Sequence, residues 1–393
     1  MQRLKTYLRK NRALLGAIFT LAWPAMLEQL LQTVVQYADS AMVGQLGAQA
    51  TAAVGLTTPV NWLVNSPMFA MGVGFLACIS RDLGARDDRT ARAAAGQSIF
   101  AVLILGTVMG IITVGLSPLI PGWLNAAPEI RDTAGQYFAI VSLPMLFRAS
   151  SIIFASALRA SGNTRTPMLV SLAMNAINVV LNFLLIFPGR EISLLGARFF
   201  MPGAGLGVVG AAIATAVSYV ASGLMMFRAL WRSPALSPKG QPLRWDRAVM
   251  GQCARVGVPV VFTRIGVSLG HVVFLSQVSV LGTVSLAAHS LALTTEEAVY
   301  LPGYGMQAAA STLAGNAVGE GSEAKLMGVS RLILLVAVLL MTCTGALLFL
   351  FPGVMLSLFT PDQAVIAQGA VVLRIIAVTE PIYAAGIIWE GVF

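Results

Sequence analysis

The chain has 393 residues, of which 57% are hydrophobic and only 10% are charged, and its formal net charge is +9. Because soluble globular proteins carry about 25% charged residues, this composition excludes a soluble protein. Apolar runs recur along the whole chain, which also excludes a soluble domain on a single anchor. The positive charge does not indicate a nucleic-acid partner, because the basic residues gather in alternate loops.

Ten apolar segments are long enough to span about 30 Å of hydrocarbon, and lipid-facing segments of this length must be helices. They lie at 13–38, 51–79, 93–120, 134–157, 166–187, 206–229, 254–280, 284–314, 328–351 and 366–389. The predicted fold is an all-α polytopic membrane protein. No cleavable signal peptide is evident, because the first apolar run is too long and lacks a small-residue cleavage site.

The basic residues predict the orientation of these helices. If the N-terminus is cytoplasmic, the inside segments hold 19 Lys and Arg residues and the outside loops hold three. Such a bias follows the positive-inside rule. The sequence therefore predicts a multi-pass protein of the bacterial inner membrane with a cytoplasmic N-terminus.

Two helix-bundle lobes are predicted. The N-lobe, 1–231, holds six of the predicted helices, and the C-lobe, 250–393, holds four. Between them, the hydrophilic segment 232–249 contains prolines and basic residues and is predicted to be a cytoplasmic linker.

Matched prolines and glycines relate the two lobes. A shift of 235 residues places Pro24 on Pro259, Pro67 on Pro302, and Gly84 on Gly319. Such matches mark backbone geometry rather than mere hydrophobicity. Both lobes start on the same side, so the repeat is parallel, about an axis along the membrane normal. We expect a full plan of twelve helices, of which the C-lobe lacks the last two.

Polar side chains form stripes on several predicted helices. Gln36 and Asp39 share one face of the first helix with Glu28, and Asn61 belongs to a similar stripe on the second. Asn175, Asn178 and Asn182 share one face of the fifth. Polar groups in a membrane face a bundle interior or a cavity. Interhelical hydrogen bonding is the alternative use of such amides.

Acidic residues of the C-lobe lie elsewhere in the repeat. Glu296 and Glu297 are adjacent, so one is expected to face the cavity while the other pairs with Arg264 or an amide. Glu380, just before Pro381, is a further buried-acid candidate. These three glutamates are predicted to line a substrate cavity.

Other residues carry less specific signals. Pro24 interrupts the first helix and is either a packing residue or a hinge. The two histidines, His271 and His289, do not have metal-site spacing. The cysteines have neither metal nor redox spacing and are interpreted as packing residues: Cys78, Cys253 and Cys343.

Enzyme chemistry is not encoded in any motif. Gly205, Gly207 and Gly210 match the dinucleotide pattern G-x-G-x-x-G, which requires a strand before it and an acid about 20 residues later, whereas the sequence predicts a loop before these glycines and an apolar helix after them. We interpret these glycines as a turn with close helix packing. The sequence predicts neither an enzyme nor a bound cofactor.

Several stretches together resemble the MATE (multidrug and toxic compound extrusion) family of transporters. They are "LAWPAMLEQLLQTVVQYADSAMVGQLG" (21–47), "LRASGNTRTPM" (158–168), "NVVLNFLLIF" (178–187), "GVVGAAIAT" (207–215) and "LGTVSLAAHSLAL" (281–293). The resemblance implies two six-helix lobes around a central cavity. It also implies export of organic cations in exchange for Na⁺ or H⁺.

The resemblance further implies site residues. Asp39 corresponds to the first-helix acid of the family's cation site and is a candidate Na⁺ ligand. Asn178-Val-Val-Leu-Asn182 resembles the pattern N-x-x-L-D, with Asn182 where some members have Asp. Asn178 and Asn182 are then expected to supply carbonyl oxygens to Na⁺ or to position Asp39.

The alternative function is a flippase for a lipid-linked saccharide, as in related two-lobe proteins. Such a protein would line its cavity with several basic residues to bind pyrophosphate. Only Arg148, Arg264 and Arg374 lie away from the ends of the predicted helices, against at least four acids. We therefore expect an antiporter, with small organic cations and membrane lipid as its partners, acting as a monomer.

Overall fold

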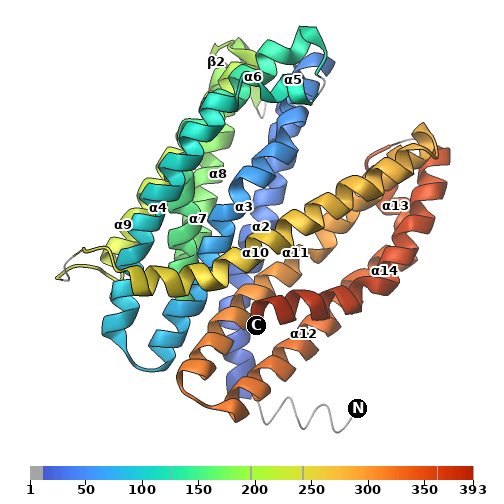
Figure 1. Cartoon of the computed structure of the whole chain (residues 1–393). Helices are drawn as coiled ribbons and strands as arrows, with labels where there is room; N and C mark the ends of the chain where they lie inside the picture. The colour runs from blue at the N-terminus through green and yellow to red at the C-terminus, as the bar shows by residue number, and fades with distance from the viewer. Residues whose placement is uncertain (1–11, 125, 195–196, 241–242, 361, 393) are drawn as a thin grey trace.

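The computed structural model describes residues 12–124, 126–194, 197–240, 243–360 and 362–392. Long helices dominate it, joined by short turns (Figure 1). The helices are α2 (Arg12–Gly44), α3 (Ala48–Gly84), α4 (Asp88–Leu116), α5 (Ile120–Trp123), α6 (Pro128–Ser142), α7 (Met145–Ala160), α8 (Arg165–Ile186), α9 (Gly207–Arg232), α10 (Arg247–Ser279), α11 (Thr283–Gly319), α12 (Glu323–Leu350), α13 (Pro352–Ser357) and α14 (Gln363–Val392). This architecture confirms the predicted all-α polytopic fold.

Eight of the described helices are long and apolar enough to cross a membrane, and the α6–α7 pair makes a ninth candidate. The eighth predicted segment, 284–314, corresponds to α11, which has 37 residues but is not among the apolar spans. Polar side chains recur along it, including Glu296 and Glu297. The helix predicted at 284–314 is therefore present, but its polar side chains make it less apolar than the other long helices.

The predicted span 134–157 is broken in two. Its halves, α6 and α7, bend by 53° at Leu143–Pro144. Proline lacks the amide hydrogen that would continue the helix and its ring crowds the preceding turn. Pro144 therefore starts α7 as its N-cap, whereas Pro24 and Pro381 lie inside α2 and α14, which remain continuous.

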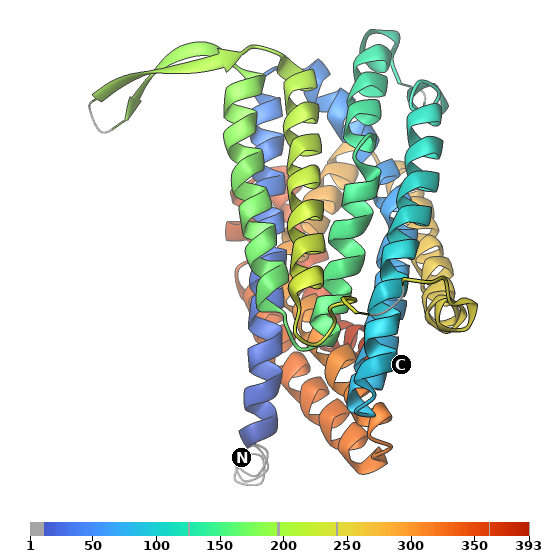
Figure 2. The same ribbon diagram turned by 90° about the vertical axis from the view of Figure 1, so that its left-hand side faces the viewer.

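A two-stranded hairpin interrupts the helical architecture between α8 and α9. Its antiparallel strands are β1 (Pro188–Leu194) and β2 (Ala197–Ala204). The hairpin projects sideways from the end of the bundle opposite the N-terminal end of α2 (Figure 2). The sequence had indicated only an outside loop here.

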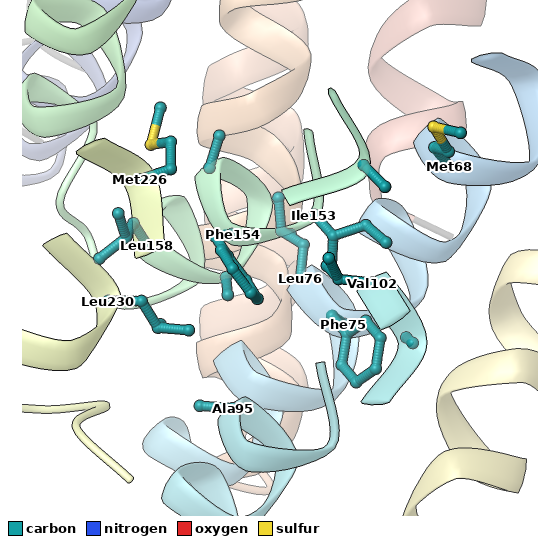
Figure 3. Packing of buried hydrophobic residues seen from close by; sticks show 14 of the residues in the cluster. Met68, Phe75, Leu76, Ala95, Val102, Ile153, Phe154, Leu158, Met226 and Leu230 are labelled. Atoms are coloured by element: carbon teal, nitrogen blue, oxygen red, sulfur yellow. The ribbon is translucent and has the colours of Figure 1, made fainter. Parts of the chain in front are cut away.

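Tight packing of apolar side chains fixes the N-lobe. Phe75 of α3, Phe154 of α7 and Met226 of α9 belong to one buried cluster, with at most 2% of each residue exposed (Figure 3). A separate cluster joins the lobes, since Ile18 and Leu21 of α2 pack with Ile333 of α12. The first half of α2 therefore packs directly against the C-lobe.

The lobes also meet where α3 and α11 end. A methyl group on Gly84 would lie 2.6 Å from Asn316 Cα, and one on Gly319 would overlap the Arg81 carbonyl oxygen. Only glycine allows the two backbones to approach this closely. We call this contact of Arg81, Gly84, Asn316 and Gly319 the α3–α11 seal.

The repeat makes this seal self-complementary. The shift of 235 residues maps Arg81 onto Asn316 and Gly84 onto Gly319. The Gly84–Asn316 approach is therefore the counterpart of the Gly319–Arg81 approach across the pseudo-twofold axis. Glycine is therefore required at both matched positions for the same reason, which is close backbone contact at the axis.

Candidate functional site

A cluster around Asp39 connects α2, α8 and α9. The Asn182 Nδ2 donates to Asp39 Oδ1 at 2.5 Å and to Asn178 Oδ1 at 3.1 Å. Asn178 Nδ2 in turn donates to Thr215 Oγ1 at 3.4 Å. With the Asn178 amide reversed, its nitrogen instead donates to both Asp39 oxygens, at 2.7 and 3.1 Å. In either orientation, at least one buried amide holds the carboxylate in place.

Aromatic and basic side chains surround this cluster. Tyr137 of α6 is close enough to interact electrostatically with both Asp39 and Arg148. The Arg148 guanidinium lies over the Tyr219 ring, 4.5 Å from its centroid. Its Nη1 is buried and has no hydrogen-bond partner in the described part of the chain. The Asp39 cluster is therefore set in a polar N-lobe interior that also contains one fixed positive charge.

The chemistry of the Asp39 cluster suits a small hard cation. Asn182 Oδ1 is buried and has no hydrogen-bond partner among the described residues. With the Asp39 carboxylate it offers oxygen ligands of the kind that hard cations prefer. A soft or transition metal is not indicated, since no group of three or more His, Cys, Asp or Glu side chains gathers among the described residues.

Other predicted N-lobe residues lie apart from these contacts. Asn175 shares the buried face of α8 and is 4% exposed, and its Nδ2 has no partner in the described chain. The half-buried Asn61 likewise leaves its Oδ1 unpartnered there. Gln36, one turn before Asp39, is exposed. None of the three has a hydrogen bond to Asp39 among the described residues.

The C-lobe acids form a second cluster. Glu380 is 1% exposed, and neither carboxylate oxygen has a partner among the described residues. Glu296 lies near enough to interact with it electrostatically. Gly345 of α12 makes room for Glu380, since a methyl group there would lie 3.1 Å from Glu380 Cβ. Two acidic side chains thus lie near each other inside the C-lobe.

Three tyrosines accompany these acids. The Tyr300 ring lies 5.6 Å from that of Tyr304 and 5.7 Å from that of Tyr383, both edge to face. Aromatic faces attract cations, so acids and rings together suit an organic cation. Glu297 interacts electrostatically with Tyr300 and with Tyr37 of α2. Glu296 therefore lies near Glu380, and Glu297 lies near Tyr37 of the N-lobe helix α2.

The suggested pairing of a glutamate with Arg264 is wrong. The Arg264 guanidinium lies over the Phe69 ring of α3, 5.7 Å from its centroid. Its Nε is buried and has no hydrogen-bond partner in the described chain. Interaction across the lobes therefore occupies this arginine instead of an ion pair with Glu296 or Glu297.

An ion pair in the bundle was not predicted. Arg159 Nη2 donates to Glu28 Oε1 and Oε2 at 2.8 and 2.7 Å. The Thr312 hydroxyl of α11 donates to the Arg159 carbonyl oxygen at 3.1 Å. The sequence places Glu28 only on the polar face of the first helix, because a partner 131 residues away leaves no local signal. Glu28 thus has a basic partner, whereas the hydrogen-bond partners of Asp39 within the described residues are amides.

A family model identifies the chain. The MatE model matches residues 24–184 and 259–393, one segment in each half. A relative from Thermotoga maritima, "Probable multidrug resistance protein NorM", is 28% identical over 95% of this chain and 78% of the relative. "Multidrug resistance protein PmpM" of Pseudomonas aeruginosa is 25% identical over 91% of this chain and 74% of its own length.

Solved structures are similar over nearly the whole chain. One, described as the outward-facing conformation of a multidrug resistance MATE family transporter, has a TM-score of 0.85 and 25% identity. It covers 96% of this chain, which in turn covers 82% of it. Another, MATE in complex with MaD3S, has a TM-score of 0.85, 26% identity and coverages of 96% and 81%. The chain therefore belongs to the MATE family of multidrug efflux transporters, which are membrane transporters and not enzymes.

Proposed function

We propose that this protein is a secondary antiporter that exports organic cations in exchange for Na⁺ or H⁺. The observation that carries the proposal is the Asp39 carboxylate, which is held by buried amides inside an apolar bundle and has no basic partner within the described residues. An acid in such a place favours binding a proton or a cation. No cofactor is needed beyond the coupling ion.

The coupling ion and the organic cation compete for the same negative charge, and this competition couples import of the ion to export of the organic cation. A carboxylate in a low-dielectric interior is costly unless it is neutralised, so an empty Asp39 favours uptake of the coupling ion. Asn182 Oδ1, which is buried without a partner in the described chain, is available as a second oxygen ligand for Na⁺. Asn178 and Asn182 thus position Asp39, and Asn175 lines the same helix face.

The C-lobe cluster is proposed to contact the organic cation. Glu296, Glu297 and Glu380 supply negative charge, and the neighbouring tyrosines supply aromatic faces. Gln36 and Asn61 are proposed to line the cavity on the N-lobe side. The names of the relatives, which include "Multidrug export protein MepA" of Staphylococcus aureus, support a small organic substrate.

Alternating access is proposed to act through the α3–α11 seal. Backbone contact at Gly84 and Gly319 closes the end of the bundle at which α2 begins. With a cytoplasmic N-terminus, this arrangement closes the cytoplasmic side. Pro24, within the part of α2 that contacts the C-lobe, is proposed as a hinge that repositions Asp39. The protein is proposed to act as a monomer, surrounded by lipid, in the bacterial inner membrane.

A lipid-linked saccharide flippase is the less favoured function. Its pyrophosphate would need several convergent basic groups. Arg148 instead lies over Tyr219 in the N-lobe, Arg264 lies over Phe69, and Arg374 is exposed on α14. The dispersed positions of these arginines favour a cationic substrate.

Reconstituted vesicles test the proposal. An ethidium-like dye is supplied on one side of the vesicle membrane. A Na⁺ gradient and a proton gradient are then imposed in separate experiments. We expect one of the two gradients to drive dye export, and Asp39→Asn to abolish this export while leaving the protein folded. Wild-type vesicles that move no dye under either gradient would overturn the antiport proposal.

A further inference from the structure

Two buried cysteines meet across the lobes. Cys78 of α3 is 5% exposed and Cys253 of α10 is 0% exposed. Their thiols lie close enough to influence each other electrostatically, and both are free cysteines. The first residue belongs to the N-lobe and the second to the C-lobe. The interpretation of these cysteines as unrelated packing residues is therefore incomplete.

Close backbone packing keeps these thiols together. A methyl group on Gly74, one helical turn before Cys78, would overlap the Cys253 carbonyl oxygen, and one on Gly257 would lie 2.7 Å from the Ala70 carbonyl oxygen. The two helices thus cross in backbone contact at this point (Figure 1). A disulfide needs Cα atoms about 4.4–6.8 Å apart, a spacing that only helices this close provide.

A polar contact also joins α3 and α10, at the side of their crossing that lies nearer the α3–α11 seal. Arg81 Nη2 donates to Gln252 Oε1 of α10 at 3.2 Å and to its neighbour Asp82 at 2.8 Å. Arg81 also belongs to the seal. The cysteine pair therefore lies within one turn of the contact that is proposed to open and close.

We propose that Cys78 and Cys253 form an oxidative modification site, at which a hydroperoxide-class oxidant converts the two thiols into a disulfide that ties the lobes together. The disulfide would hold the α3–α10 crossing shut, and with it the adjoining α3–α11 seal. Transport would stop until the bond is reduced. This last consequence rests on the proposed antiport function, whereas the cross-link itself does not.

The chemistry balances with one hydroperoxide per disulfide. One thiolate attacks the peroxide, so that an S–O bond forms, the O–O bond breaks and an alkoxide or hydroxide leaves. The second thiol then attacks the resulting sulfenic sulfur, forming the S–S bond and releasing the oxygen as water. The peroxide is reduced by two electrons and the thiol pair is oxidised by two. A dithiol reverses the reaction by thiol–disulfide exchange.

Access to the thiols depends on the position of the lobes. Both are buried while the lobes are closed at this crossing, so an oxidant reaches them when the crossing opens. Closure then brings the sulfenic acid against the second thiol. The modification would therefore accumulate in protein that is cycling between the two arrangements.

A cross-linking assay tests the site. The exposed Cys343 is replaced by serine to prevent links between molecules, and a protease site is introduced between α9 and α10. Membranes are treated with hydrogen peroxide, the linker is cut, and the two fragments are separated on a non-reducing gel. We expect the fragments to stay linked in C343S and to separate in C343S/C78A and C343S/C253A. Dithiothreitol should separate the linked fragments.

Dye efflux is measured on the same membranes. We expect efflux to fall as the linked fraction rises and to recover with dithiothreitol, while C343S/C78A keeps its efflux in peroxide. Fragments that separate after peroxide treatment, with both thiols still alkylatable, would overturn the site. Linked fragments with unchanged efflux would overturn the proposal that the disulfide stops transport. If the reduced protein moves no dye, the antiport proposal fails, and the gel result for the thiol pair still stands.

Discussion

Asn182 donates an amide hydrogen bond of 2.5 Å to Asp39, joining helices α8 and α2 across 143 residues of sequence. The amide is removed from bulk solvent, since Asn182 is 1% exposed, and Asp39 is half-buried. Hydrogen bonds to a charged partner are stronger than those between neutral groups. The position of the carboxylate is therefore set by α8 as much as by its own helix.

Replacing Asp39 by asparagine removes the proposed coupling charge while keeping the side-chain shape. We expect coupled dye export to be lost, because an amide neither takes up a proton nor supplies a negative charge to Na⁺. Asp132→Asn, an exposed acid on α6, is the matched control and should transport normally. Gradient-driven export by Asp39→Asn at the wild-type rate would remove Asp39 from the mechanism.

Replacing Asn182 by leucine keeps the volume but removes the donor to Asp39. Because hydrogen bonds to charged groups contribute about 1.5–3 kcal/mol, we expect the affinity for the coupling ion to change by roughly 10- to 100-fold. The measurement is the dependence of dye export on Na⁺ concentration and on pH. Unaltered dependence on both would mean that Asn182 does not support Asp39.

Replacing Glu380 by glutamine tests the C-lobe cluster. We expect weaker export of organic cations, because the buried charge next to Glu296 is lost. Glu390→Gln, on the same helix but exposed, is the control and should behave as wild type. Equal dye affinities for the two variants would place the substrate elsewhere.

The ion pair of Glu28 and Arg159 predicts a stability effect. Arg159→Met leaves a buried carboxylate without its partner, so we expect the free energy of unfolding to fall by about 3 kcal/mol. The double variant Glu28→Gln/Arg159→Met should lose less than the sum of the single variants. Thermal unfolding in detergent measures the stability of the two single variants and the double variant. Additive losses of stability would show that Glu28 and Arg159 are not coupled.

The α3–α11 seal predicts an effect of added bulk. Gly319→Ala places a methyl group on the Arg81 carbonyl oxygen, so we expect the lobes to separate at this end. Labelling of Cys253 by a maleimide should then become faster in the C343S background. Gly328→Ala, where a methyl group meets no atom within 4 Å, is the control. Equal labelling of the two variants would contradict the role of the seal.

Sequence by itself determined the fold class and the residue types of the candidate site. Long apolar runs require helices, since unpaired backbone groups are too costly in lipid. Asp39 and the three asparagines stood out because polar side chains are expensive there. The matched glycines at 84 and 319 could also be recognised in the sequence, although the backbone contact that requires them could not.

Only the tertiary structure decided which of these residues meet. Among the described residues, Asp39 is hydrogen-bonded to Asn182 but not to Asn175 or Asn61, and Glu28 pairs with Arg159. Periodicity gives the face of a helix but not the rotation and crossing of its neighbours. Those depend on side-chain packing and on backbone approach at glycines. The same crossing brings Cys78 against Cys253, a contact between two lobes that no local pattern in the chain records.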